Sequence, residues 1–263
     1  MQNHTLLVAS LRAKVTVSVL RLLPIAAFAV AAMILLGVAA VRAAALPVVT
    51  GWQAVLIAGD DGEPVFDNAV AAFDHWLHSL GVPQGDIHRL SAHHGDRAAT
   101  APASDANVLA QIAGLQPQPG QGCLVFVTSH GKEDEGVWLA YNHEFLWAVS
   151  LARALGEGCQ TAPTVVIVSS CYSGAFTTGS MRAANRIILS AARADRPSFG
   201  CQADRTYTVF DECLLRALTR AGDWRGVYRD ELACVQDRER RMHVLASEPQ
   251  AFFGAAVRRL PVR

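Results

Sequence analysis

Two uninterrupted apolar runs, Leu124 to Thr128 and Val165 to Ser169, constrain the fold of this chain more than any other feature. Neither run alternates between apolar and polar residues, as a strand with one solvent-exposed face does. Continuous apolar strands are typical of parallel sheets whose two faces are both covered by helices. The two runs therefore predict interior parallel strands of an α/β domain.

The segments around these runs alternate between strand-like and helix-like patterns. Short apolar runs predict strands over 54–58, 87–90 and 187–191, and apolar residues at helical spacing predict helices over 66–80, 105–115, 146–155 and 210–221. A hairpin is expected around 137–145, and the unpatterned stretch 91–104 is interpreted as a loop. This alternation predicts one α/β domain with a mostly parallel sheet over residues 46–263.

Residues 1–45 have the pattern of an export segment. Met1 to Arg21 carries three basic residues and no acidic one, and Leu22 to Val41 runs for twenty residues without a charge. Such a run is long enough to span a bilayer, and small residues follow it. A basic flank favours the cytoplasmic side, so we expect the remainder to be exported to the periplasm or another extracytoplasmic space. A cleaved signal peptide and an uncleaved inner-membrane anchor both fit this pattern.

The charge balance gives no support to a nucleic-acid partner. The chain contains 23 basic and 23 acidic residues, so its formal net charge is zero. Proteins that bind nucleic acid usually concentrate positive charge on one surface. We expect contact with a membrane only through the possible N-terminal anchor, and the sequence does not predict the oligomeric state.

A histidine and a cysteine directly follow the two apolar runs. The first run leads into Ser129-His130-Gly131, and the second into Ser170-Cys171-Tyr172-Ser173-Gly174. Ligands of open parallel sheets bind at the carboxyl ends of the strands. Neighbouring strands are roughly 4.8 Å apart. His130 and Cys171 could therefore lie close together at one edge of the sheet.

This pairing would suit nucleophilic catalysis. A free thiol has a pKa of about 8.5 and is mostly protonated at neutral pH. A nearby imidazole favours the thiolate, which is the nucleophile. Backbone amides near Gly131 and Cys171 could stabilise an oxyanion. A lone cysteine at a strand end is more often a small buried residue, so a purely structural role for Cys171 stays open at this point.

The two blocks resemble a known family. Cys123-Leu-Val-Phe-Val-Thr-Ser-His130-Gly131, followed by Val-Val-Ile-Val-Ser-Ser-Cys171-Tyr-Ser-Gly174, is similar to the pattern of the legumain-like cysteine peptidases of family C13. These enzymes belong to the same broad clan as caspases and gingipains. The segment from Ala191 to Cys201 looks like one that bacterial members carry. The resemblance covers residues 52–220.

The resemblance implies a fold, a reaction and a set of roles. It implies a caspase-like three-layer α/β/α sandwich and a cysteine endopeptidase that acts on peptides or proteins. Cys171 would be the nucleophile and His130 the general base and acid. The oxyanion hole would be formed by the amides of Gly131 and Cys171. No metal and no organic cofactor would be needed.

Several positions depart from the pattern of plant and animal members. Asp61 stands where those members have an asparagine that supports the histidine, and it is the candidate third catalytic residue. Ser169 replaces an acidic pocket residue, and Asp211 matches another pocket acid. Asp60, Asp61 and Asp211 could together form an acidic pocket for a Lys or Arg side chain of the substrate. Arg193 could contact the substrate backbone or could form a surface ion pair.

Four of the other cysteines could form disulfides. Cys123 and Cys159 each precede one of two adjacent predicted strands, at the edge opposite the catalytic pair. Cys213 and Cys234 could form a second bridge. Disulfides are typical of exported proteins.

Two alternatives to hydrolysis remain. The same site could serve a transpeptidase or another acyl transferase. The chain could also be a non-enzymatic caspase-like scaffold that binds partners.

Overall fold

The computed structural model describes residues 49–262, and Leu46–Arg263 form one compact unit. The predicted export segment, residues 1–45, lies outside the described residues. Within 49–262, no helix combines the length and the hydrophobicity that a bilayer crossing requires.

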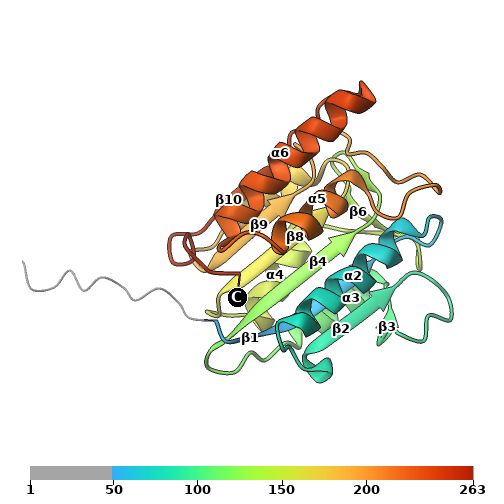
Figure 1. Ribbon diagram of the computed structural model, residues 1–263. Helices are drawn as coiled ribbons and strands as arrows, with labels where there is room; N and C mark the ends of the chain where they lie inside the picture. Colours follow the sequence, from blue (N-terminus) through green and yellow to red (C-terminus); the bar gives the residue numbers. More distant parts are fainter. Residues whose placement is uncertain (1–48, 263) are drawn as a thin grey trace, which may run out of the picture. The chain divides into compact units, whose positions relative to one another are not determined.

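A seven-stranded sheet forms the centre of this unit, in the strand order β10-β9-β8-β4-β1-β2-β3 (Figure 1). The strands are β1 (Gly51–Ala58), β2 (Ile87–Ser91), β3 (Ala101–Pro102), β4 (Gln121–Thr128), β8 (Thr164–Ser169), β9 (Arg186–Ser190) and β10 (Gln250–Phe253). Only the pair of β9 and β10 is antiparallel. A smaller antiparallel sheet contains β5 (Gly131–Lys132), β6 (Gly136–Leu139) and β7 (Glu144–Leu146).

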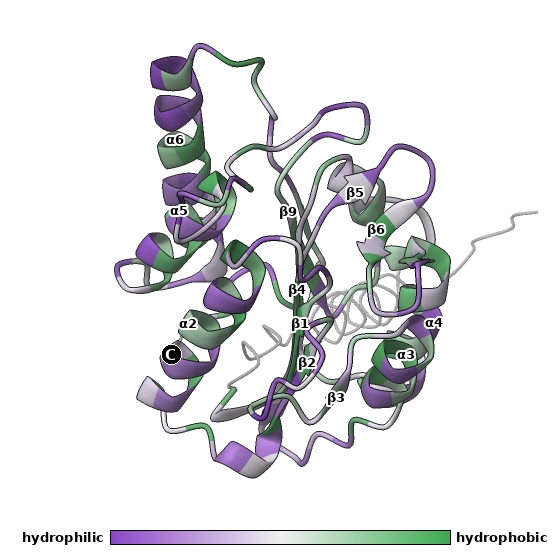
Figure 2. Ribbon diagram, turned by 90° about the vertical axis from the view of Figure 1, so that its right-hand side faces the viewer, coloured by the Kyte–Doolittle hydropathy of each residue, from purple (hydrophilic) through white to green (hydrophobic). Residues whose placement is uncertain are grey.

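Helices cover both faces of the large sheet. The α-helices are α2 (Val65–Ser79), α3 (Asp105–Ala113), α4 (Ala148–Gly158), α5 (Val209–Leu218) and α6 (Trp224–Met242). Three short 3-10 turns are η1 (Gln84–Asp86), η2 (Ser173–Thr177) and η3 (Gly179–Met181). Figure 2 shows the sheet nearly edge-on, with α2, α5 and α6 on one side and α3 and α4 on the other. This is the three-layer α/β/α sandwich with a mostly parallel sheet that the sequence predicts.

Two hydrophobic cores explain why the central strands are apolar throughout. Leu56 and Phe126 point into the core shared with α2, α5 and α6, whereas their neighbours Val55 and Val125 point into the core shared with α3 and α4. Phe73 of α2 stacks on Phe126 with ring centroids 4.6 Å apart. A strand buried on both faces needs apolar residues at every position.

The C-terminal part of the domain differs from expectation. The sequence pattern predicts no element after residue 221, but the structure contains α6 and β10. The inward face of α6 carries Glu231 and Glu239 beside Val235, and all three side chains are buried. Because acidic residues occupy these interior positions, the apolar period of the helix is interrupted and the sequence does not indicate it.

Both expected disulfides are present. Cys123 pairs with Cys159, with Cα atoms 5.9 Å apart, and Cys213 pairs with Cys234, with Cα atoms 5.6 Å apart. The first links the start of β4 to the end of α4, and the second links α5 to α6. Cys171 and Cys201 are the free cysteines of the described residues.

Candidate active site

The adjacent strands β4 and β8 carry His130 and Cys171 to the same edge of the sheet. Thr128 is paired in register with Ser169, and the amide of Ser129 donates to the carbonyl of Ser169 over 3.1 Å. His130 and Cys171 each lie two residues beyond that last pair. Their backbones are so close that a Cβ atom on Gly131 would collide with the Cys171 carbonyl group. The close approach therefore requires glycine at 131.

The chain turns sharply at the cysteine. Tyr172 has a φ of 59°, in the left-handed region that non-glycine residues rarely adopt. Its amide donates to the carbonyl of Arg196 over 2.8 Å, which fixes the turn to the loop after β9. Ser173 Oγ donates to the carbonyl of Ser170 over 2.7 Å. These bonds hold Cys171, half-exposed, at the tip of the turn.

Ser198 contacts the Cys171 sulfur through its amide, its hydroxyl and its carbonyl group. Its amide lies 3.3 Å and its hydroxyl 3.7 Å from Sγ, and both can donate to the sulfur. The thiol can in turn donate to the Ser198 carbonyl over 3.5 Å. Two possible hydrogen-bond donors of Ser198 are thus directed at the sulfur. Sequence reasoning gave Ser198 no role.

His130 is positioned by packing. Its half-buried ring meets Phe66 edge to face, with centroids 5.3 Å apart, and its carbonyl accepts the Trp138 amide over 3.0 Å. Among residues 49–262, the imidazole nitrogens of His130 have no hydrogen-bond partner. Asp61 is exposed and forms no hydrogen bond or ion pair with any described residue. No hydrogen bond or ion pair therefore joins Asp61 to His130 among the described residues, and the role of Asp61 as third catalytic residue stays a prediction.

Asp60 shapes the loop between β1 and α2. The amide of Gly59 donates to the carbonyl of Thr128 over 3.0 Å, so this loop starts beside the end of β4. Asp60 is 9% exposed, and its Oδ1 accepts the Gly62 amide over 2.8 Å. Burial raises the pKa of the Cys201 thiol, and the charges of Cys171, Glu63 and Asp60 raise it further. Asp60 and Cys201 thus lie near the candidate nucleophile.

Asp211 lies beneath the strand ends. Its carboxylate is fully buried, and Oδ2 accepts the hydroxyl of Thr128 over 2.8 Å. Burial raises the pKa of Asp211 to about 6, against the opposing effect of hydrogen bonds from Ser169, Thr128 and Thr208. Ser169 is also buried, with 2% exposure. Both side chains lie below the surface of the site, because the hydrogen bonds that Asp211 accepts hold them in the interior.

Arg193 is held in an ion-pair network. Its guanidinium bonds Asp195 at 2.5 Å and Glu248 at 2.6 Å, and Glu248 also lies 3.6 Å from Arg196. The Arg193 amide donates to the carbonyl of Ser247 over 2.9 Å. The network joins the segment after α6 to the loop that contacts Cys171.

The model of the Peptidase C13 family matches residues 104–232, a region that contains both His130 and Cys171. The chain belongs to the peptidase C13 family. This membership indicates a cysteine-peptidase type of function and a peptide or protein substrate. No curated protein matches the sequence.

Two contacts of this C13 domain were beyond sequence reasoning. Ser198 lies in the segment 191–201 that carries part of the family resemblance, but its contact with Cys171 spans 27 residues. Phe66 belongs to the apolar stripe of a helix, and its contact with His130 joins residues that are still farther apart in the sequence. No local pattern distinguishes such residues from their neighbours.

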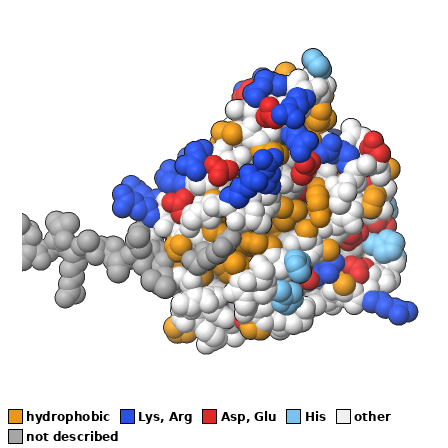
Figure 3. All heavy atoms as spheres, in the orientation of Figure 1, with side chains coloured by type: hydrophobic (Ala, Val, Ile, Leu, Met, Phe, Trp, Pro, Cys, Tyr) orange, Lys and Arg blue, Asp and Glu red, His pale blue; other side chains and the backbone are white. Residues whose placement is uncertain are grey.

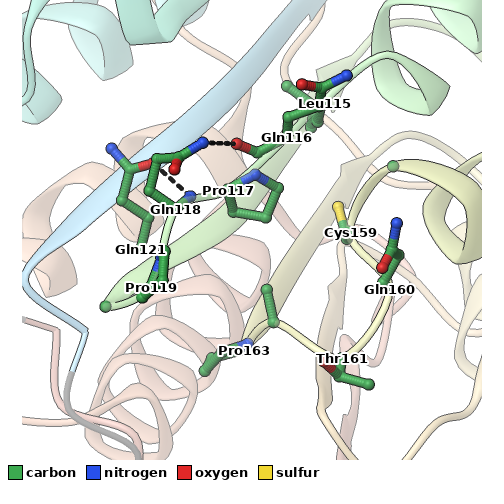
Figure 4. A pocket seen from close by; sticks show the side chains of 13 residues that line it. Leu115, Gln116, Pro117, Gln118, Pro119, Gln121, Cys159, Gln160, Thr161 and Pro163 are labelled. Carbon is green, nitrogen blue, oxygen red and sulfur yellow. Dashed lines mark hydrogen bonds between the residues drawn. The ribbon is translucent and has the colours of Figure 1, made fainter.

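Two observations concern the parts of the described C13 domain away from His130 and Cys171. Within residues 49–262, no group of three or more His, Cys, Asp or Glu side chains could hold a metal ion. A cleft of about 400 Å³ lies between the segments 115–121 and 158–163 (Figure 4). These segments precede β4 and β8, so the cleft is at the opposite edge of the sheet from Cys171.

Proposed function

We propose that this chain is a cysteine endopeptidase with Cys171 as the nucleophile and His130 as the general base and acid. The observation that carries the proposal is the placement of these two residues at the adjacent carboxyl ends of β4 and β8 in a C13 chain. The contacts from Ser198 to Sγ support it, because they hold the sulfur in a fixed position beside the end of β8.

The proposed reaction has two steps. His130 takes the Cys171 proton, the sulfur attacks the peptide carbonyl carbon, and the C–N bond breaks as His130 returns the proton to the leaving amine. Water, deprotonated by His130, then hydrolyses the thioester and releases the free thiol. The amides of Cys171 and Gly131 would stabilise the oxyanion in each step. The Cys171 amide has no other acceptor in the described part of the chain, so it is available for this role.

The proposed pocket for the residue before the cut lies beside the β1–α2 loop. Asp60, Asp61 and Glu63 belong to this loop, and none forms an ion pair with another described residue. Arg193 and Arg196, by contrast, are neutralised by Asp195 and Glu248. The uncompensated negative charge favours Lys or Arg before the cut, with Asp60 as the pocket residue. Ser169 and Asp211 would form its buried floor.

A peptidase assay tests both proposals. Full-length protein is given a fluorogenic peptide panel that varies the residue before the cut. We expect cleavage by the wild type, a loss of at least about a thousandfold in Cys171→Ala and His130→Ala, and a preference for basic residues that Asp60→Asn weakens. Cleavage that persists in Cys171→Ala would refute the mechanism. Equal cleavage after basic and neutral residues would refute only the pocket assignment.

We also propose that the domain is exported. The charge pattern of residues 1–45 and the two disulfides support this location, since disulfides persist in oxidising compartments. Mass spectrometry of the mature N-terminus should find a start near residue 46 if the segment is a cleaved signal, or Met1 if it is an anchor. Both outcomes should coincide with two intact disulfides. Reduced cysteines at all four positions in the isolated native protein would contradict export.

A further inference from the structure

A cleft between α5 and α6 carries arginine side chains that the proposed peptidase chemistry does not use. Its volume is about 480 Å³, and the two helices with the turn between them supply its whole lining. Its charged lining residues are Arg216, Arg220, Asp230, Asp237, Arg238 and Arg241. Guanidinium groups therefore outnumber carboxylates in the cleft.

The geometry of the cleft is fixed by a covalent link. The Cys213–Cys234 disulfide forms part of the lining and holds the Cα atoms of its two residues 5.6 Å apart. Ala217 of α5 and Ala233 of α6 also line the space. Their short side chains leave room between the helices, so the arginines surround a cavity that a ligand can enter.

The carboxylates of the cleft are already engaged. Asp237 is paired with Arg241 at 2.6 Å and with Arg240 at 3.4 Å. Asp230 is paired with Arg229 at 3.0 Å. Neither acid forms an ion pair with Arg216 or Arg220.

Arg216 and Arg220 form no ion pair within residues 49–262, and both are exposed. Arg238 and Arg205 both form ion pairs with Glu212. Figure 3 shows Lys and Arg side chains gathered over α5 and α6. Positive charge from two helices thus converges on one cavity without a matching number of free carboxylates.

We propose that this cleft binds a phosphate-bearing anion. The planar guanidinium fork presents paired N–H donors that match the oxygens of a phosphate group. Arg216 and Arg220 would make the main contacts, and Arg238 and Arg241 would close the opposite wall. The phosphate could belong to a soluble compound or to the headgroup of an anionic phospholipid.

Titration calorimetry on the full-length protein in neutral detergent tests this site. The probes are pyrophosphate, dihexanoyl-phosphatidylglycerol and, as the zwitterionic counterpart without net charge, dihexanoyl-phosphatidylcholine. We expect binding of pyrophosphate, of the phosphatidylglycerol or of both, and weaker binding as salt rises. Pyrophosphate alone would indicate a soluble ligand, and phosphatidylglycerol alone would indicate a lipid headgroup.

The variant Arg216→Gln/Arg220→Gln should weaken the binding about tenfold or more. The matched control Arg258→Gln/Arg259→Gln removes two exposed arginines outside the cleft and should bind as the wild type does. The thermal unfolding midpoints of both variants verify that the fold is retained. Equal weakening in the two variants, no weakening in the cleft variant, or no binding of either anionic probe at millimolar concentration would each overturn the proposal.

Discussion

Single contacts around Cys171 and His130 decide how the proposed pair is held. Ser198 directs an amide and a hydroxyl at Sγ, and Phe66 packs against the imidazole. The carboxylate of Asp61 reaches neither residue within the described structure. The proposed pair is therefore held by backbone and packing contacts, and the backbones come so close that a Cβ atom on Gly131 would collide with the Cys171 carbonyl group.

Gly131→Ala should disable the site while leaving most of the domain folded. The new Cβ would collide with the carbonyl group of Cys171, which is backbone and cannot move aside alone. We expect peptidase activity to fall about a hundredfold, because small displacements of a reacting group have effects of that order. Steady-state kinetics and circular dichroism measure the two quantities. Gly156→Ala is the control, since a Cβ there meets no atom within 4 Å. Equal activity of both variants would contradict this geometry.

The two central residues were predictable from the sequence, and their supporting contacts were not. His130 and Cys171 directly follow continuous apolar runs, so strand pairing alone brings them to one edge. Ser198 and Phe66 reach the site from other elements, and no local period reveals such contacts. Asp211 matched a pocket position by resemblance, but full burial and the bond from Thr128 place it in the interior.

At the scale of elements, α6 differs from the other helices in burying two glutamate side chains on its inward face. Glu231 is fully buried, and neither of its carboxylate oxygens has a hydrogen-bond partner within residues 49–262. Glu239 is 3% exposed and accepts the Ser247 amide through Oε1 over 3.0 Å. Burial raises the pKa of Glu231 well above its ordinary value of 4.5, and the charge of Glu239 raises it further.

This shift predicts that the domain loses stability between mildly acidic and neutral pH. The folded state holds the Glu231 proton more tightly than the unfolded chain does. The contribution is fully present below about pH 4.5 and is lost as pH rises through the folded-state pKa. Asp211, with its pKa raised from 3.8 to about 6, acts in the same direction.

Glu231→Gln should therefore raise the free energy of unfolding at pH 7.5 by roughly 1–3 kcal/mol and flatten its dependence on pH. Urea unfolding at pH 5 and pH 7.5 measures both effects. Glu157→Gln removes an exposed carboxylate of α4 and should change neither. A Glu231→Gln protein that is less stable than the wild type at pH 7.5 would contradict the assignment of a destabilising buried charge.

The same helix shows where prediction by periodicity ends. The helices over 66–80 and 210–221 were predicted close to their observed bounds because their inward faces are almost wholly apolar. In α6 the inward positions include Glu231 and Glu239. The sequence of this helix therefore resembles that of a solvent-exposed segment, although one face of it is buried. Strand β10 adds only four residues, and its burial is partial throughout.

At the scale of the whole domain, different edges and faces carry different features. The carboxyl ends of β4 and β8 carry the proposed catalytic pair, the opposite edge carries the cleft of Figure 4, and the outer helical layer carries the arginine cleft. Two disulfides fix the last two regions. The alternation of strands and helices predicted this sandwich, because a doubly covered parallel sheet is the main way to bury continuous apolar strands.

The reactivity of Cys171 relative to Cys201 tests the central claim most directly. Both thiols are free and half-exposed, so Cys201 serves as an internal reference in the same molecule. Full-length protein is pulsed with iodoacetamide at pH 7, and the labelling of each cysteine is followed by peptide mass spectrometry. We predict that Cys171 reacts at least about tenfold faster than Cys201 and that His130→Ala removes most of this difference. Equal rates at the two cysteines, unchanged by His130→Ala, would contradict the proposed catalytic pair.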